Sequence, residues 1–66
     1  MKIFVNGEAE DLEKKITVAE LVQRHRLAPE STLLELNGVA LHRREWERAM
    51  LGESDRVEIL RVAAGG

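Results

Sequence analysis

The sequence contains no cysteine, which excludes disulfide bonds and thiolate metal sites as sources of stability. Aromatic residues are scarce as well, because Phe4 and Trp46 are the only two. No apolar run approaches the roughly 20 residues that a membrane-spanning helix requires. The apolar part of Met1 to Gly7 is also too short for a signal peptide. We therefore expect a cytoplasmic protein with no membrane segment, stabilised by packed aliphatic side chains.

Neither sign of charge dominates the chain, which has 10 basic and 12 acidic residues and a formal net charge of -2. Nucleic-acid-binding domains usually carry a basic excess on one face, so we expect no nucleic-acid partner. The basic clusters Arg24–Arg26 and His42–Arg44 are short, and we interpret them as solvated surface. Neither a metal-ligand spacing nor a nucleophile–base pair is present. We expect no bound cofactor and no catalysis by the chain itself.

The length of 66 residues allows one domain, and a domain of this size buries about 60% of the surface of its unfolded chain. A hydrophobic content of 44% is sufficient for one core. Leu, Val and Ile must fill that core because aromatic side chains are few. We expect a chain this small to fold with a modest margin of stability and to be a monomer when free.

The first part of the chain predicts a β-hairpin. Lys2–Val5 is rich in β-branched and aromatic residues, which favours a strand. Asn6-Gly7 follows, and this dipeptide suits a turn that needs positive φ at both central positions. A second, more polar strand is expected to return through roughly Glu8 to Ile16, at an edge of the sheet.

A helix is predicted next, from about Val18 to Arg26. Thr17 stands three residues before Glu20, which is the spacing of a capping box at a helix start. An apolar stripe with positions i, i+3, i+4 and i+7 is formed by Val18, Leu21, Val22 and His25. Pro29 cannot continue the helix.

The remaining elements are predicted in this order: a strand Thr32–Leu36, a turn Asn37-Gly38, a short strand Val39–His42, one helical turn or irregular structure in Arg43–Ala49, and a last strand Arg56–Val62. Within the irregular part, Trp46 is expected to serve as a packing anchor. Asp55 is expected to bond nearby backbone amides in the turn before the last strand.

This order of elements, β-β-α-β-β-β, predicts an α+β fold. One helix with one apolar stripe must cover one face of a sheet. The first and last strands are the most apolar, so we expect them to be central and adjacent, with the long crossover that parallel neighbours require. A mixed sheet of four to five strands packed on one helix is the β-grasp, or ubiquitin-like, fold. We expect residues 1–62 to form this domain and residues 63–66 to form a flexible C-terminal tail.

The tail ends in Gly65-Gly66, and these glycines have a possible chemical use. Without Cβ atoms they can pass through a narrow channel and let groups of another protein approach closely. A carboxylate is a poor acyl donor until it is activated, for example by ATP as a mixed anhydride. A sulfur nucleophile can then convert it to a thiocarboxylate, which needs no cysteine in the carrier. A frayed terminus is the alternative interpretation, although two closing glycines occur by chance in only about 0.5% of chains.

Several short motifs occur together along the whole chain: Met1-Lys2-Ile3, Asn6-Gly7-Glu8, Thr17-Val18-Ala19-Glu20-Leu21-Val22, Asn37-Gly38, Arg43 with Trp46, Asp55-Arg56-Val57-Glu58-Ile59 and Gly65-Gly66. In this order and spacing the sequence resembles the sulfur-carrier proteins of bacterial thiamine (thiazole) biosynthesis. Two loop positions depart from the pattern of that family. His42 stands where it usually has Pro, and Ser54 stands where it usually has Gly.

The resemblance implies a cycle in which the chain is a protein cosubstrate. An E1-like enzyme would adenylate the Gly66 carboxylate with MgATP, and sulfur from a cysteine desulfurase would give the thiocarboxylate. Thiazole synthase would then accept this sulfur. The tail and partner-binding residues implied are Gly65, Ala64, Ala63, Val62 and Leu60.

Two other functions fit the same features. The sulfur carrier of molybdopterin synthesis, the small subunit of molybdopterin synthase, shares the tail and the activation chemistry. A ubiquitin-like protein modifier shares the fold, but it would form isopeptide bonds with lysine side chains. The partner that binds the chain, and the chemical form of its C-terminus, distinguish these alternatives.

Overall fold

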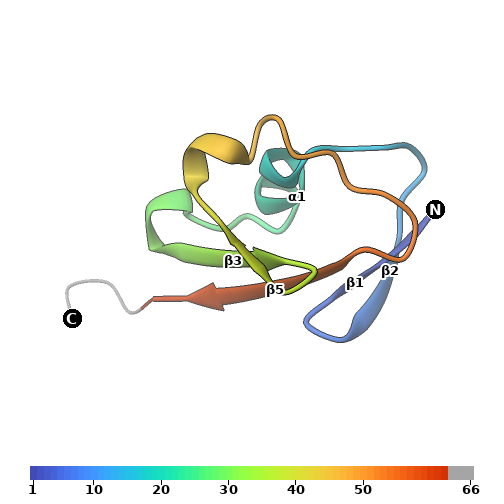
Figure 1. The fold of residues 1–66 in the computed structure, drawn as a ribbon, viewed down its shortest axis with the longest axis horizontal. Helices are drawn as coiled ribbons and strands as arrows, with labels where there is room; N and C mark the ends of the chain where they lie inside the picture. Colours follow the sequence, from blue (N-terminus) through green and yellow to red (C-terminus); the bar gives the residue numbers. More distant parts are fainter. Residues whose placement is uncertain (63–66) are drawn as a thin grey trace.

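The computed structural model describes residues 1–62, which form a five-stranded mixed sheet with one helix across one face (Figure 1). The elements are β1 (Lys2–Val5), β2 (Glu8–Asp11), α1 (Val18–Arg24), β3 (Thr32–Leu36), β4 (Val39–Leu41) and β5 (Arg56–Arg61), with short 3-10 turns at Pro29–Ser31 and Arg43–Glu45. The strand order is β2-β1-β5-β3-β4, in which β1 and β5 are parallel neighbours. The predicted β-grasp fold and its parallel pair of first and last strands are confirmed.

Both Asn-Gly dipeptides form the predicted hairpin turns. Asn6 and Gly7 have φ of 50° and 84°, and Asn37 and Gly38 have φ of 51° and 84°. Positive φ at both central positions matches the twist of the flanking strands, which brings Val5 opposite Glu8.

The prediction that the second strand extends to Ile16 is wrong, because β2 ends at Asp11. Asp11 is opposite Lys2, the first residue of β1, and the Leu12 N–H donates to the Met1 carbonyl at 2.7 Å. Leu12 then turns into the core, where it is 2% exposed. The second strand therefore ends where Leu12 joins the core.

The start of α1 is the predicted capping box. The Thr17 hydroxyl accepts a hydrogen bond from the Glu20 N–H at 3.1 Å, and the Glu20 carboxylate accepts one from the Thr17 N–H at 2.8 Å. These bonds satisfy two of the main-chain donors that a helix start leaves free. The buried residues of α1 are Val18, Leu21 and Val22.

The end of α1 differs from the prediction, because the helix stops at Arg24 and not at Arg26. Arg26 has φ of 57°, so its N–H bonds the Gln23 carbonyl and the next N–H, of Leu27, bonds the Val22 carbonyl. This pattern is a Schellman motif. It turns His25 to the surface, and the prediction that His25 completes the apolar stripe is wrong. Leu27 packs against the core instead.

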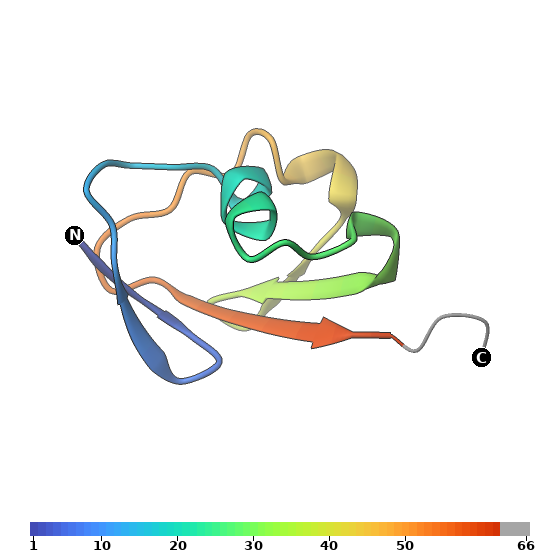
Figure 2. The ribbon, with the colours of Figure 1, turned by 180° about the vertical axis from the view of Figure 1, so that it is seen from behind.

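The segment after β4 lies on the same side of the sheet as α1 (Figure 2). Trp46 is 4% exposed, which confirms that it is a packing anchor. The Ala49 carbonyl accepts from the Val18 N–H at 2.8 Å, so this segment also fixes the start of α1. The core as a whole contains Ile3, Leu12, Ile16, Val18, Leu21, Val22, Leu34, Trp46, Leu51, Val57 and Ile59.

Candidate functional site

The predicted site residues lie at the end of β5 and beyond it. Gly66, Gly65, Ala64 and Ala63 are outside the described residues. Strand β5 ends at Arg61, one residue before the predicted end at Val62. The end of this strand lies on the opposite side of the molecule from the N-terminus (Figure 1). The exposed fractions of Leu60 and Val62 are 66% and 49%. Val62 is tied to the fold because its N–H donates to the Ser31 carbonyl at 2.7 Å.

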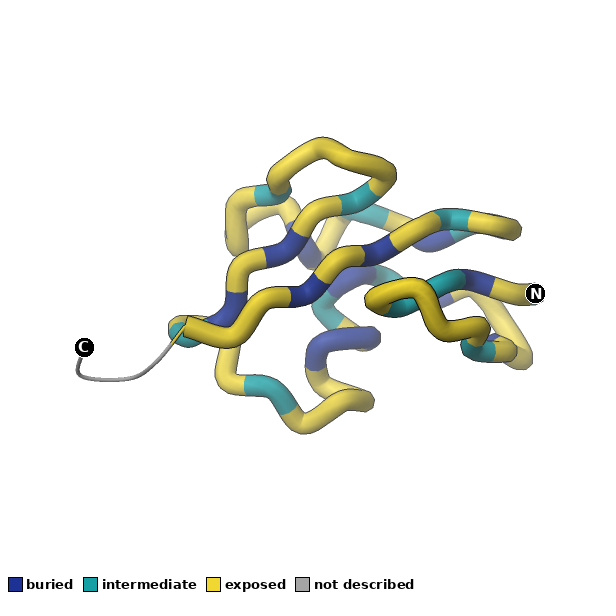
Figure 3. Tube along the Cα trace, turned by 90° about the horizontal axis from the view of Figure 1, so that it is seen from below, coloured by how far each residue is buried: buried dark blue, intermediate teal, exposed yellow. Residues whose placement is uncertain are grey.

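Strand β5 has one buried face and one exposed face. Val57 and Ile59 are buried on the face that α1 covers, whereas Arg56, Glu58 and Leu60 are exposed on the opposite face. Strand β3 alternates in the same way, with Leu33 and Glu35 exposed. Figure 3 shows this alternation of buried and exposed positions along the strands. We call the face turned away from α1 the outer face of the sheet.

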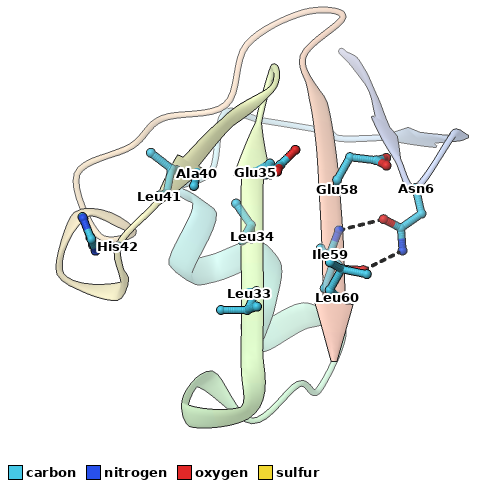
Figure 4. A pocket seen from close by; sticks show the side chains of 10 residues that line it. All are labelled: Asn6, Leu33, Leu34, Glu35, Ala40, Leu41, His42, Glu58, Ile59 and Leu60. Carbon is cyan, nitrogen blue, oxygen red and sulfur yellow. Dashed lines mark hydrogen bonds between the residues drawn. The ribbon is translucent and has the colours of Figure 1, made fainter. Parts of the chain in front are cut away.

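The outer face carries a groove with a volume of about 580 Å³ (Figure 4). The groove is lined by Asn6, Leu33, Leu34, Glu35, Ala40, Leu41, His42, Glu58, Ile59 and Leu60. Two cross-strand pairs lie side by side in it. Leu33 is opposite Leu60, and Glu35 is opposite Glu58. The exposed fraction of Leu33 is 59%, so both leucines of the first pair present apolar surface to solvent.

Asn6 holds the groove side of β5 in place. Its side-chain oxygen accepts from the Ile59 N–H at 2.7 Å, and its side-chain nitrogen donates to the Ile59 carbonyl at 3.2 Å (Figure 4). Strand β1 has already ended at Val5, so the carboxamide takes the place of one further peptide group of β1. This keeps β5 extended as it approaches the tail.

Asn37 holds the other end of β5 in a similar way. Its side-chain oxygen accepts from the Arg56 N–H at 2.9 Å, and its side-chain nitrogen donates to the Asp55 carboxylate at 3.0 Å. The second oxygen of Asp55 accepts from the Gly52 N–H at 2.7 Å, which confirms the predicted role of Asp55 in this turn. The two Asn-Gly turns thus position β5 as well as reversing the chain.

The salt bridges within residues 1–62 are confined to one cluster. Within residues 1–62 the salt bridges both involve Glu10, whose carboxylate lies 2.8 Å from the His25 Nε2 and 3.8 Å from the Arg24 guanidinium. Neither Glu35 nor Glu58 has such a partner there. The hydrogen bond from the Thr17 amide lowers the pKa of the Glu20 carboxyl.

In residues 1–62 no group of three or more His, Cys, Asp or Glu side chains could hold a metal ion. No helix in the same part of the chain is long and apolar enough to cross a membrane.

Of the residues that line the groove, sequence reasoning assigned only Leu60 to the site, and it missed the others, among them Asn6, Leu33 and Glu35. The twofold alternation of a strand places Leu33 on the same face as the charged Glu35, which is a signal for the exposure of Leu33. Asn6 was assigned only to its turn. Its bonds to Ile59 join residues that are far apart in the sequence, and no local pattern indicates them.

Comparison with known proteins gives consistent results. Residues 3–66 match the model of the ThiS family. The crystal structure of the thiamine biosynthesis protein ThiS from Geobacter metallireducens has a TM-score of 0.85 and 30% identity, covering 100% of both chains. Its solution structure has a TM-score of 0.83 and 30% identity, covering 100% of this chain and 88% of that one.

Among curated proteins, a thiazole synthase of Magnetococcus marinus is 32% identical over 66 residues. The match covers 100% of this chain but only 20% of that protein, so the chain spans about a fifth of its length. An uncharacterised protein of Trieres chinensis, ycf40, is 25% identical over 63 residues, covering 96% of this chain and 86% of that one.

Proposed function

The chain belongs to the ThiS family, the sulfur carriers of thiamine biosynthesis, and we propose that it carries sulfur as a thiocarboxylate on Gly66. The observation that carries this proposal is the family match, which extends through Gly66 and so includes Gly65-Gly66. In this role the chain is a substrate of its partner enzymes and has no catalytic residue of its own.

The proposed chemistry begins with activation of the Gly66 carboxylate by an E1-like enzyme. A carboxylate oxygen attacks the α-phosphorus of MgATP and pyrophosphate leaves, which gives an acyl adenylate. A hydrosulfide equivalent from a cysteine desulfurase then attacks the carbonyl carbon. A C–S bond forms, the C–O bond to AMP breaks and a proton is released. Where sulfur arrives as a persulfide, a thiol supplies the two electrons that free the thiocarboxylate.

The proposed acceptor is thiazole synthase. The thiazole synthase of Magnetococcus marinus contains a segment similar to the whole of this chain, which supports a functional association between the two. Gly65, Ala64 and Ala63 would form the slim part of the tail that enters partner sites, because none of them carries a side chain larger than a methyl group. Leu60 and Val62 would contact partners beside the tail, since both are exposed at the end of β5.

Intact-mass measurement tests this proposal. The chain is incubated with the activating enzyme of the same organism, MgATP, a cysteine desulfurase, cysteine and a thiol. We expect a mass gain equal to the replacement of one oxygen by sulfur, and no gain for the chain that lacks Gly66. An unchanged mass for the full chain, with an enzyme shown to be active on another carrier, would contradict the proposal.

The same experiment separates the alternatives. A ubiquitin-like modifier would appear as isopeptide adducts on lysine side chains and not as a free thiocarboxylate. A molybdopterin carrier would transfer its sulfur to the large subunit of molybdopterin synthase. The match to the ThiS family and to its solved structures favours the thiamine pathway.

A further inference from the structure

A single main-chain hydrogen bond ties the chain to the fold just beyond the end of β5. The paired register of β3 and β5 ends where Thr32 is opposite Arg61. One residue further, the Val62 N–H donates to the Ser31 carbonyl at 2.7 Å. Four residues follow Val62 in the sequence and end in the Gly66 carboxylate. Within residues 1–62, this bond is therefore the attachment closest in sequence to the group that reacts.

The Ser31 carbonyl is a fixed acceptor, because the turn that carries it is bonded internally. This turn, Pro29–Ser31, lies beside the end of β5 (Figure 1). The Ala28 carbonyl accepts from the Ser31 N–H at 3.0 Å and from the Thr32 hydroxyl at 2.7 Å. The Thr32 N–H donates to the Pro29 carbonyl. Since Thr32 is only 6% exposed, water competes little for its hydroxyl bond, and the turn is held against the core.

The N–H groups next to Val62 point in the other direction. Successive N–H groups of a strand alternate between its two sides. The Ile59 N–H donates to the Asn6 side chain, on the side of β1. The Arg61 N–H, two residues further, points to that same side, whereas the Val62 N–H points to the side of β3 and Ser31. Anchoring to the turn thus depends on one N–H group, and the neighbouring N–H provides a matched comparison.

We propose that the Ser31 carbonyl is a positioning group for the activation of Gly66, because it fixes at four the number of residues between the fold and the carboxylate. This role rests on the function proposed above. Four residues reach at most about 14 Å, and each further residue adds about 3.5 Å. A tethered group reacts fastest when its tether matches the distance to be spanned, and the carboxylate must also be oriented against the α-phosphorus. Holding Val62 to the turn keeps that length constant without contact with the reacting atoms.

The test replaces the Val62 amide by an ester in a chemically synthesised chain, which removes the N–H and keeps the side chain. The control is the same replacement at Arg61. Exchange of pyrophosphate into ATP by the activating enzyme of the same organism measures acyl-adenylate formation. We expect the Val62 ester to lower kcat about fivefold at an unchanged KM for the carrier, because the released residue must be ordered again in each turnover. The Arg61 ester should react as the wild type does.

Deletion of Ala63 tests the length directly. In the wild-type chain it leaves three residues after the anchored Val62, which reach about 3.5 Å less, so kcat is expected to fall more than tenfold. In the Val62 ester the released residue takes the place of the deleted one. The same deletion is therefore expected to lower kcat less than about threefold there. Two independent defects would multiply, so this non-additivity distinguishes positioning from a general weakening of the fold.

Thr17→Ala is the control for stability alone, since it weakens the fold at the start of α1 and should leave kcat unchanged. Equal kcat for the two ester chains would overturn the inference, as would an equal effect of the Ala63 deletion in both backgrounds. A fall in kcat for Thr17→Ala as large as that for the Val62 ester would also overturn it. No exchange with the wild-type chain, by an enzyme active on another carrier, would instead refute the proposed function.

Discussion

Within residues 1–62 the non-glycine residues with a left-handed backbone are Asn6, Arg26, Asn37 and Ser54, with φ of 50°, 57°, 51° and 69°. Asn tolerates this conformation better than most residues do, and both asparagines here also form side-chain hydrogen bonds with strand β5. Ser54 lacks that compensation, since its side chain has no hydrogen bond in the described part of the chain.

Ser54→Gly is therefore expected to stabilise the fold. Glycine adopts positive φ without strain, and the Ser54 N–H that donates to the Lys2 carbonyl at 2.7 Å is retained. The expected gain in the free energy of unfolding is about 0.5–1 kcal/mol, after the higher entropy of glycine in the unfolded chain is subtracted. Urea unfolding measures it. Ser54→Ala is the control, because it removes the hydroxyl but keeps the strain, and an equal gain there would contradict the explanation.

Asn6→Gly isolates the two bonds between the Asn6 carboxamide and Ile59. The glycine keeps the positive φ of the turn and removes only the side chain. Loss of two part-buried hydrogen bonds is expected to lower the free energy of unfolding by about 1–2 kcal/mol. Hydrogen exchange of the Ile59 amide should become faster, while amides that pair β1 with β2 keep their protection. Uniform loss of protection across the sheet would contradict a local role for Asn6.

At the scale of elements, the start of α1 depends on two reciprocal bonds between Thr17 and Glu20. Thr17→Ala removes the hydroxyl that caps the helix and is expected to cost about 1 kcal/mol in the free energy of unfolding. Thr17→Ser is the matched control, because serine also caps well. A serine variant as unstable as the alanine variant would show that the methyl group, and not the hydroxyl, is responsible.

The same cap predicts a dependence of stability on pH. The Thr17 amide holds the pKa of the Glu20 carboxyl below its ordinary value of 4.5. Because the folded pKa is the lower one, the stabilisation is complete above pH 4.5 and is lost as the pH falls through the folded pKa. The difference in the free energy of unfolding between wild type and Glu20→Gln should shrink from neutral pH to about pH 3. A difference independent of pH would contradict the charged cap.

The elements that carry local signals were predicted well, whereas the C-terminal ends of α1 and β2 were not. The capping box fixes where α1 begins, and the Asn-Gly turn fixes where β1 ends. The end of α1 depends on a left-handed Arg26, and no periodicity in the sequence indicates that conformation. The end of β2 depends on the burial of Leu12, which is a property of the folded core. Contacts between distant residues thus set the boundaries that sequence reasoning missed.

At the scale of the whole molecule, the proposed site has two parts of different origin. The first part, Gly65-Gly66, can be recognised from the sequence alone, because it is defined by its residue types and not by contacts within the fold. The groove cannot, because its pairs Leu33–Leu60 and Glu35–Glu58 arise from the register between β3 and β5. Strand alternation predicts which residues share a face, but it does not predict which residues of another strand lie opposite them.

This division predicts that docking and chemistry can be separated. Under the proposed function a chain that lacks Gly66 carries no sulfur but retains the groove, so it should compete with the thiocarboxylated carrier for thiazole synthase. The expected signature is a higher apparent KM for the carrier with kcat unchanged in thiazole formation. Adding Leu60→Ser to the shortened chain should relieve the inhibition, because its 66% exposed side chain is part of the groove.

Val39→Ser in the shortened chain is the matched control. The Val39 side chain is 62% exposed, close to the value for Leu60, but it does not line the groove. Both are surface substitutions, expected to change the free energy of unfolding by less than about 0.5 kcal/mol. The control chain should therefore inhibit as strongly as the shortened chain itself. Equal inhibition by the Leu60 and Val39 variants would place the docking surface elsewhere, and no inhibition by any shortened chain would show that binding depends on the tail alone.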